Sequence, residues 1–263
     1  MMYTYSINDK KSPTDLEDQE RANRYVVQEV CRVDPGVILI KTIGAVPEGR
    51  LTPTSDYDYC VFSLSPSAFR YSDQVSVPNV KGKWRCLDPE LSRPLSVTFL
   101  TVNEVLQRIL ALDFKREDHL TFYMYFHYVV WNYLCSNNPP LYVNDKGEEL
   151  LNMAVLFINR ETVEHVDQFV KSVHPYLTRD KWEKWKVFRK HSKSVLYGLQ
   201  MCKWAIDGNL LGFDIKLVPH IPASFDAYVE EYKSLVHEID HDLIKQLPPM
   251  DRISVTDAVN FFS

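Results

Sequence analysis

The chain contains 263 residues and carries a formal net charge of −5, from 30 basic and 35 acidic side chains. This balance excludes a histone-like basic binder, and a hydrophobic content of 45% excludes a solvated acidic tail protein. The length allows one large domain or two domains of about 100–150 residues. The sequence contains no internal repeat and no low-complexity segment.

The cysteines and the chain start predict a soluble cytoplasmic protein. The five cysteines are single, with no CxxC pair, which is typical of a reducing compartment and of neither a disulfide framework nor a zinc ribbon. Residues 8–20 are polar and acidic, so we expect no signal peptide. The longest apolar stretch, residues 122–134, is too short to cross a bilayer, so we expect no membrane span. The cysteines are Cys31, Cys60, Cys86, Cys135 and Cys202.

The first hundred residues predict a small sheet with flanking helices. Ser12-Pro13-Thr14-Asp15 is typical of a helix start, and the helix is expected to end near Val33. The β-branched run 37–43 predicts a buried central strand, followed by strands at 56–62 and 95–100. The stretch from 63 to 93 predicts a loop with a short hairpin around residues 81–83.

From Thr101 the hydrophobic period changes from 2 to 3.6 residues. Thr101 and Glu104 form a capping box, and helices are expected at about 117–135, 148–159, 161–174, 179–207 and 224–246. Gly208 is expected to end the helix at 179–207, and Pro248-Pro249 the helix at 224–246. The sequence therefore predicts an α+β fold with a mixed-sheet domain at 1–110 and an all-helical domain at 111–263.

The loop between the first two predicted strands is the most informative segment. It begins with Gly44 and enters the second strand with Asp56 and Asp58. Alternate strand residues share a face, so the two carboxylates point the same way and repel each other. A divalent cation relieves this repulsion, and hard oxygen ligands suit Mg²⁺ with nucleotide phosphates. Gly44 allows the backbone to approach a phosphate closely, and N–H groups of the following turn are expected to contact it.

This loop resembles the signature of the polymerase-β-like nucleotidyltransferases, in which a Gly-Ser pair is followed about ten residues later by Ser-Asp-x-Asp. The resemblance implies a nucleotidyltransferase-type sheet and a two-metal mechanism with Mg²⁺ or Mn²⁺. It implies that Asp56 and Asp58 are catalytic and bind the metal, and that a nucleoside triphosphate contacts Gly44, Ala45, Gly49 and Ser55. The alternative is a Gly/Pro turn followed by two solvent-facing aspartates. The matching residues are Gly44, Gly49, Pro53, Ser55, Asp56 and Asp58.

A second, shorter resemblance covers residues 193–201 and 207–210. This stretch is similar to the C-terminal helix of the predicted nucleotidyltransferases associated with RNA repair, which implies that Lys193 contacts the nucleotide. Tyr197 and Gln200 stand where that helix carries a His and an Arg. The alternative is an amphipathic core helix with Tyr197, Met201 and Trp204 facing inward.

Two departures from the polymerase-β-like pattern lead to two functional hypotheses. Ala45 replaces the Ser of the Gly-Ser pair, and the third strand carries Ser96 and Thr98 where a third metal-binding acid is expected. The nearby acids are Asp88, Glu90 and Glu104. The first hypothesis is a metal-dependent enzyme that transfers a nucleoside monophosphate to a hydroxyl of RNA, protein or a small molecule. The second is a catalytically degenerate module that binds a nucleotide, RNA or a protein.

Residues 179–193 form the most basic part of the chain, with seven Lys or Arg among Trp182, Trp185 and Phe188. Basic residues interleaved with aromatic ones are typical of RNA binding through phosphate contacts and stacking. The favoured alternative is an amphipathic helix whose aromatic side is core and whose lysine side is in water.

The remaining patterns favour structural roles. Residues 237–241 match the HExxH zinc pattern, but the charged Asp240 at an inner position favours a solvated helix face. The aromatic cluster 122–133 has helical spacing throughout and predicts core. His119, His127 and His174 have no partners at ligand spacing and predict ordinary surface or core histidines.

Overall fold

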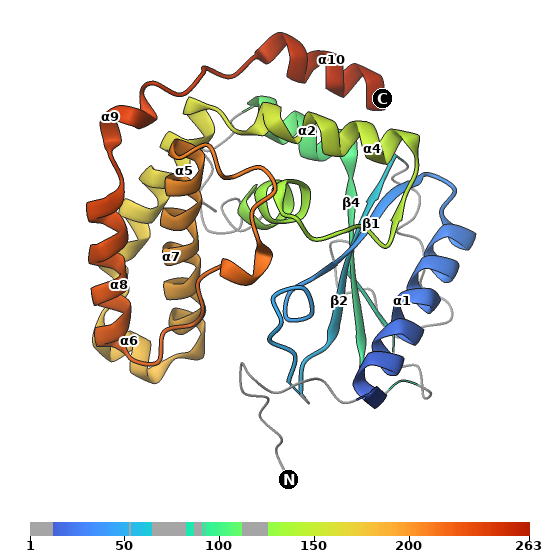
Figure 1. Cartoon of the computed structure of the whole chain (residues 1–263), viewed down its shortest axis with the longest axis horizontal. Helices are drawn as coiled ribbons and strands as arrows, with labels where there is room; N and C mark the ends of the chain where they lie inside the picture. Colours follow the sequence, from blue (N-terminus) through green and yellow to red (C-terminus); the bar gives the residue numbers. More distant parts are fainter. Residues whose placement is uncertain (1–12, 53, 65–82, 87–90, 92, 112–125) are drawn as a thin grey trace. The chain divides into compact units, whose positions relative to one another are not determined.

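In a computed structural model, the chain forms the predicted α+β fold: a mixed sheet with flanking helices, and a larger set of helices. The structure describes residues 13–52, 54–64, 83–86, 91, 93–111 and 126–263 (Figure 1). The chain divides into two compact units. Unit 1 comprises Met1–Leu110, Asn138–Asn152 and Thr256–Ser263, and unit 2 comprises Ala111–Asn137 and Met153–Val255. Residues 138–152 and 256–263 thus lie with the first unit, whereas the sequence predicted a single boundary near 110.

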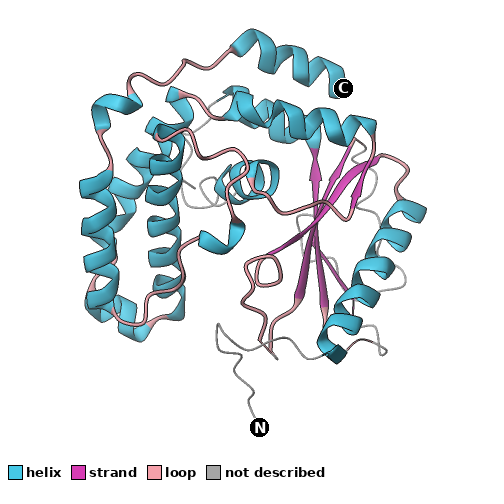
Figure 2. Cartoon of the chain, in the orientation of Figure 1, coloured by secondary structure: helices cyan, strands magenta, loops and turns pink. Residues whose placement is uncertain are grey.

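Unit 1 contains a five-stranded sheet in the order β3-β4-β2-β1-β5 (Figure 2). β2 and β4 are parallel, and the other neighbouring strands are antiparallel. The three predicted strands are confirmed, and β5 is an additional strand contributed by residues beyond 110. The strands are β1 Val37–Ile43, β2 Tyr57–Ser63, β3 Lys83–Cys86, β4 Leu95–Thr101 and β5 Tyr142–Val143.

The long helix α1, Pro13–Val33, packs on one face of this sheet (Figure 1). Tyr57 and Tyr59 of β2 turn toward it, and both rings are fully buried. The Tyr57 hydroxyl donates to Asp18 Oδ2 at 2.9 Å, and the Tyr59 hydroxyl donates to Asn23 Oδ1 at 3.0 Å. Because side chains alternate along a strand, Asp58 is on the face of the sheet opposite α1.

The other helices of unit 1 are α2, Val102–Ala111, and α4, Asp145–Asn152. The segment that carries β5 is tied to β1 by the N–H of Leu141, which donates to the Ile40 carbonyl at 2.8 Å. Asn103 on α2 donates from Nδ2 to Ser263 Oγ at 3.1 Å, which joins the last described residue to the same unit. α10, Arg252–Phe262, begins in residues of unit 2 and ends in residues of unit 1.

Unit 2 is helical throughout its described part, and its core lies between α5, α7 and α8. The buried faces of α5 and α7 carry Val163, Val166, Leu196 and Leu199. The elements are η2 Phe126–Cys135, η3 Met153–Phe157, α5 Arg160–Val173, η4 His174–Tyr176, α6 Arg179–Lys184, α7 Lys186–Ile206, η5 Ile215–Leu217, α8 Phe225–Glu238 and α9 His241–Ile244.

Several helices differ from the prediction in where they break. The helix expected at 179–207 is interrupted at Trp185, whose backbone is extended with φ −125° and ψ 115°. The helix expected at 224–246 is interrupted at Ile239, which is also extended. α10 follows Pro248-Pro249, where the sequence predicted no further helix. Of the helix expected at 117–135, only 126–135 lies within the described residues, where it has π-helical geometry.

Within the described residues, no helix is long and apolar enough to cross a membrane.

Candidate functional site

The two predicted metal-binding aspartates lie where the chain enters β2. Asp58 pairs with Ile43, the last residue of β1, and Asp56 directly precedes the strand. Both side chains are half-buried. The antiparallel pairing of β1 with β2 therefore places the glycine turn that follows Ile43 next to the aspartates.

The backbone of Gly44 lies beside the Asp58 carboxylate. Its backbone has φ +69°, and a Cβ atom at this position would lie 3.0 Å from Asp58 Oδ2 and 3.7 Å from Asp58 Cγ. A residue with a side chain would be strained in this backbone conformation and would press on the carboxylate. Gly44 was predicted to let a phosphate approach the backbone, which stays a prediction; in the structure the positive φ and the neighbouring carboxylate require a glycine.

The rest of the loop is held by its own backbone. The N–H of Arg50 donates to the Ala45 carbonyl at 2.8 Å, and the N–H of Gly49 donates to the Val46 carbonyl at 3.1 Å. A longer bond, 3.4 Å, joins the N–H of Glu48 to the Gly44 carbonyl. These three N–H groups are used inside the turn, so the expected phosphate contacts are limited to the beginning of the loop, at Gly44 and Ala45. Gly49 is exposed, and a Cβ there would meet no atom within 4 Å.

Ser55 stabilises the turn that leads into Asp56. Its Oγ accepts from the Thr52 N–H at 3.0 Å and lies 2.8 Å from the Thr52 hydroxyl. The Thr52 carbonyl in turn accepts from the N–H of Ser55 at 2.9 Å and from the Arg93 guanidinium. These bonds give Ser55 a positioning role for the neighbouring aspartate.

The neighbouring strand β4 carries a hydroxyl side chain at the position where a third metal-binding acid was expected. In the parallel register of β2 with β4, Ser96 is opposite Asp58 and Thr98 is opposite Cys60. Asp88 and Glu90 lie outside the described residues, as does the side chain of Glu104. In the described part of the chain, no group of three or more His, Cys, Asp or Glu residues gathers as a metal site.

A lysine on the same sheet face escaped the sequence analysis. Lys41 pairs with Cys60 in the register of β1 with β2 and is 1% exposed. It lies two residues before Ile43, the strand partner of Asp58. Burial raises the pKa of the Cys60 thiol, and the Lys41 charge acts against this rise. A charged residue inside the apolar run 37–43 was the signal that could have identified it, because burying an ammonium group is costly unless it is compensated.

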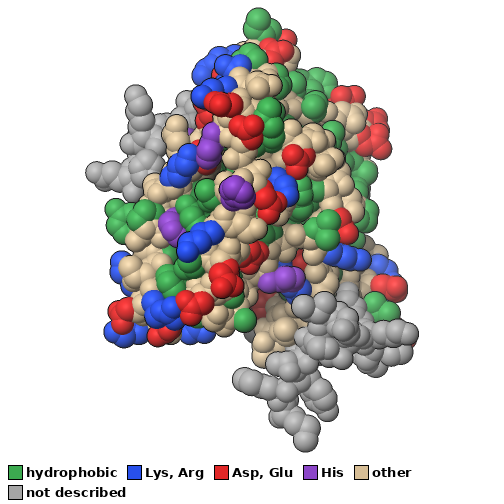
Figure 3. Space-filling view, turned by 60° about the vertical axis from the view of Figure 1, so that its left-hand side comes forward, with side chains coloured by type: hydrophobic (Ala, Val, Ile, Leu, Met, Phe, Trp, Pro, Cys, Tyr) green, Lys and Arg blue, Asp and Glu red, His purple; other side chains and the backbone are tan. Residues whose placement is uncertain are grey.

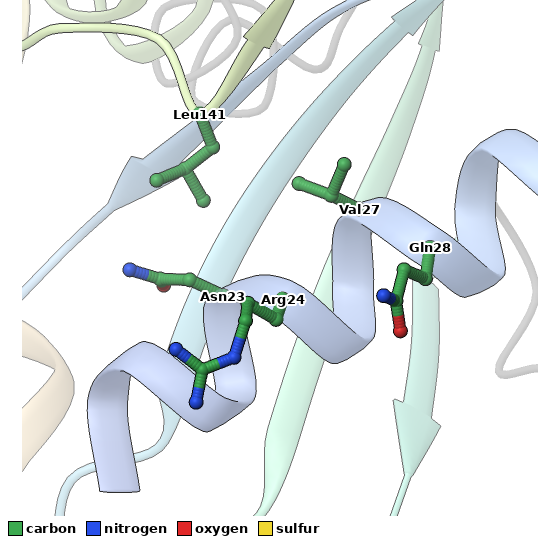
Figure 4. Close-up of a pocket in the computed structure, with 5 residues that line it drawn as sticks. All are labelled: Asn23, Arg24, Val27, Gln28 and Leu141. Atoms are coloured by element: carbon green, nitrogen blue, oxygen red, sulfur yellow. The ribbon is translucent and has the colours of Figure 1, made fainter. Parts of the chain in front are cut away.

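A pocket of about 270 Å³ lies on the other side of the sheet (Figure 4). It is lined by residues of α1 and by Leu141. One of them, Asn23, accepts the hydrogen bond from Tyr59, which points away from the Asp58 face. The pocket is therefore separate from the aspartate site. Its lining consists of Asn23, Arg24, Val27, Gln28 and Leu141.

The remaining candidates lie in unit 2. Lys193 is half-buried on α7, and Tyr197 and Met201 of the same helix are buried, as the core-helix alternative predicted. The zinc pattern 237–241 does not lie on one helix, because His237 belongs to α8 whereas His241 begins α9. Asp240 between them caps α9 by accepting from the N–H of Asp242 at 2.9 Å. The helical spacing that the zinc pattern requires is therefore absent.

Comparison with known proteins gives distant similarity to solved structures alone. No family model matches the chain, and no curated protein matches it. Among solved structures, the chain is similar to the STING-associated CdnE c-di-GMP synthase from Capnocytophaga granulosa, at 10% sequence identity and a TM-score of 0.33. The match covers 92% of this chain and 84% of that one. The chain's own residues, above all the Gly44 turn with Asp56 and Asp58, are therefore the basis on which its function is inferred.

Proposed function

We propose that the protein is a cytoplasmic, metal-dependent nucleotidyltransferase that transfers a nucleoside monophosphate from a nucleoside triphosphate to an acceptor hydroxyl. The observation that carries this proposal is the close approach of the Gly44 backbone to the Asp58 carboxylate. A turn without a side chain beside paired carboxylates suits a triphosphate and its cation. RNA, a protein side chain and a small molecule are the candidate acceptors.

In this proposal the carboxylates of Asp56 and Asp58 bind Mg²⁺ or Mn²⁺, which would supply charge neutralisation on the triphosphate. The Gly44–Ala45 backbone, which the turn brings beside the Asp58 carboxylate, is proposed to contact the phosphates. Ser55 holds the Thr52 turn and so orients Asp56. Lys193 is proposed to contact the nucleotide. Catalysis then depends on positioning and electrostatics, without a covalent intermediate on the protein.

A second candidate function is a binding module that has lost catalysis. Ser96 opposite Asp58 favours it, because a hydroxyl does not replace a carboxylate as a ligand of the second metal ion. Such a module would still bind a nucleotide at the Gly44 turn, with RNA or a protein as a further ligand.

A labelling experiment tests the enzymatic proposal. Wild type and Asp56→Asn/Asp58→Asn would be incubated with Mg²⁺ or Mn²⁺, each α-labelled nucleoside triphosphate, and total RNA and protein. The control is Asp145→Asn/Glu149→Gln, which makes the same charge change on the exposed part of α4. We expect wild type and the control to transfer label equally well. We expect transfer by the aspartate variant to be at least about a hundredfold lower.

The other outcomes separate the candidates. Metal-dependent nucleotide binding without transfer would replace the enzyme with the binding module. Equal transfer by wild type and by the aspartate variant would show that Asp56 and Asp58 take no part in the chemistry. The absence of both transfer and nucleotide binding would refute both candidate functions.

A further inference from the structure

The first turns of α7 carry a line of basic side chains, which we call the basic stripe: Lys186, Arg189, Lys190 and Lys193. Positions i, i+3, i+4 and i+7 of a helix lie on one side of it. The surrounding segment 179–193 contains seven basic and two acidic residues, in a chain whose net charge is −5. Positive charge is therefore concentrated on one short surface of an acidic protein.

Several charges of the preceding helix are paired, whereas two lysines at the start of α7, Lys186 and Lys190, form no ion pair within the described residues. Lys184 Nζ lies 2.6 Å from Asp180 Oδ1, and Arg179 pairs with Asp226. Lys186 and Lys190 are exposed, and no carboxylate of the described residues lies within ion-pair distance of either. Their ammonium groups are available to an external anion.

An exposed aromatic side chain adjoins the basic stripe. Trp185 stands at the break between α6 and α7 and is 59% exposed. The sequence alternative placed Trp182, Trp185 and Phe188 in the core. This is correct for Trp182, which is 7% exposed and donates from Nε1 to Ser192 Oγ at 3.1 Å. It is wrong for Trp185, because the extended backbone at the break turns that residue out of the helix pattern.

We propose that Trp185 and the basic stripe bind single-stranded RNA, with a base stacked on the indole and the phosphates on Lys186 and Lys190. Lys186 and Lys190 are separated by about 6 Å along the helix axis, from the rise of 1.5 Å per residue, so they contact successive parts of one backbone. This inference deepens the proposed function, because it names single-stranded RNA as the acceptor class. The binding itself requires neither nucleotide nor metal.

An anionic membrane surface fits this site less well. Membrane-surface helices bury a wide apolar face, but the apolar side of α7 is already buried inside unit 2 through Val195, Leu199 and Cys202. At its start only Trp185 and Val187 are large, apolar and exposed. In Figure 3, which turns the helices on the left of Figure 1 forward, hydrophobic side chains are interspersed with basic and acidic ones.

The test measures binding of the full chain to a fluorescent 12-nucleotide RNA without metal or nucleoside triphosphate. Lys186→Ala/Lys190→Ala is expected to weaken binding about tenfold at moderate salt and to flatten the slope of log K against log salt by about 1.4. Trp185→Ala is expected to weaken it about tenfold, and Trp185→Phe to retain most of it. The matched control is Lys216→Ala/Lys233→Ala, which removes two exposed lysines elsewhere in unit 2.

Further arms separate this site from the aspartate site and from other ligands. Asp56→Asn/Asp58→Asn should bind the RNA as wild type does, and Lys186→Ala/Lys190→Ala and Trp185→Ala should retain metal-dependent nucleotide binding. A DNA strand of the same sequence shows whether the sugar is distinguished. Three results would each overturn the proposal. The first is an equal loss of RNA affinity in the lysine control. The second is equal affinity for a duplex of the same RNA together with no effect of Trp185→Ala, and the third is binding to phosphatidylserine vesicles but not to RNA.

Discussion

Gly44 and Gly49 have almost the same backbone conformation but different surroundings. Their φ angles are +69° and +71°, both in the left-handed region that favours glycine. A Cβ at 44 would press on Asp58 Oδ2, whereas a Cβ at 49 would lie in open space. The two positions therefore separate the cost of backbone strain from the cost of a contact with the carboxylate.

We expect Gly44→Ala to destabilise the fold by about 1–3 kcal/mol and to abolish metal-dependent nucleotide binding. Gly49→Ala should cost about 1–2 kcal/mol, the strain alone, and leave binding nearly unchanged. Urea unfolding measures the stability, and titration with Mn²⁺ and a nucleoside triphosphate measures the binding. Identical effects of the two variants on binding would show that residue 44 has no special relation to a ligand.

His174 is the histidine of unit 2 with the most specific surroundings. Its Nδ1 lies 2.7 Å from the Tyr228 hydroxyl, and its ring stacks on Tyr232 at 3.6 Å between centroids. Burial lowers the pKa of His174, and burial also raises the pKa of Tyr228. Near neutral pH the two groups are therefore uncharged and share one hydrogen bond, whose donor is set by the tautomer of the imidazole.

The lowered pKa predicts a loss of stability in weak acid. A histidine in the unfolded chain has a pKa of about 6.5. Below that pH the unfolded chain binds more protons than the folded one. Unfolding therefore becomes easier as the pH falls toward the pKa of His174 in the folded protein. We expect His174→Gln to reduce this dependence between pH 7.5 and 5.5, measured by urea unfolding. Part of the pH dependence should remain in this variant, because burial also lowers the pKa of His191. The exposed His237→Gln is the control, and an equal reduction in the control would contradict the assignment to His174.

At the scale of elements, the α6–α7 corner depends on one buried hydrogen bond. Ser192, which is fully buried, accepts from Trp182 Nε1 at 3.1 Å and donates to the Arg189 carbonyl at 2.7 Å. This hydroxyl fixes the short helix α6 to α7 and, through it, the position of the break at Trp185.

Ser192→Ala is expected to lower the free energy of unfolding by about 1–3 kcal/mol, because the indole N–H of Trp182 would be buried without an acceptor. Ser172→Ala is the matched control, since its hydroxyl also donates to a carbonyl three residues earlier, but from an exposed position on α5. Its expected cost is below about 0.5 kcal/mol. Equal costs in urea unfolding would mean that the bond to Trp182 contributes nothing.

Elements with strong local patterns could be predicted, and breaks without local signals could not. The run 37–43 became a strand with the predicted bounds because its β-branched side chains are buried on both faces. Trp185 and Ile239 are not helix breakers by residue type, so the interruptions that they mark depend on tertiary packing. Asp58 lies in the second strand as predicted, whereas Asp56 directly precedes that strand, and the metal-binding role of the two residues stays a prediction. Lys41 was missed because its burial depends on the whole sheet.

At the scale of the molecule, the two units are interwoven along the chain. The edge strand β5 contains two residues, Tyr142 and Val143, which pair with Ile40 and Leu39. A two-residue strand produces no recognisable period, so its return to the first unit could not be predicted. Gly44 and Asp58 are brought together by the pairing of two consecutive strands, which a local pattern can predict, whereas the division into units depends on residues far apart along the chain.

This interweaving has a consequence during synthesis on the ribosome. Domains commonly fold in order as the chain emerges, beginning at the N-terminus. Here β1 lacks its outer neighbour until residues 142–143 have been made, and unit 1 also draws on residues 256–263. The nascent sheet therefore presents an open edge at Leu39 and Ile40 while about a hundred further residues are translated, the kind of edge that molecular chaperones protect from aggregation.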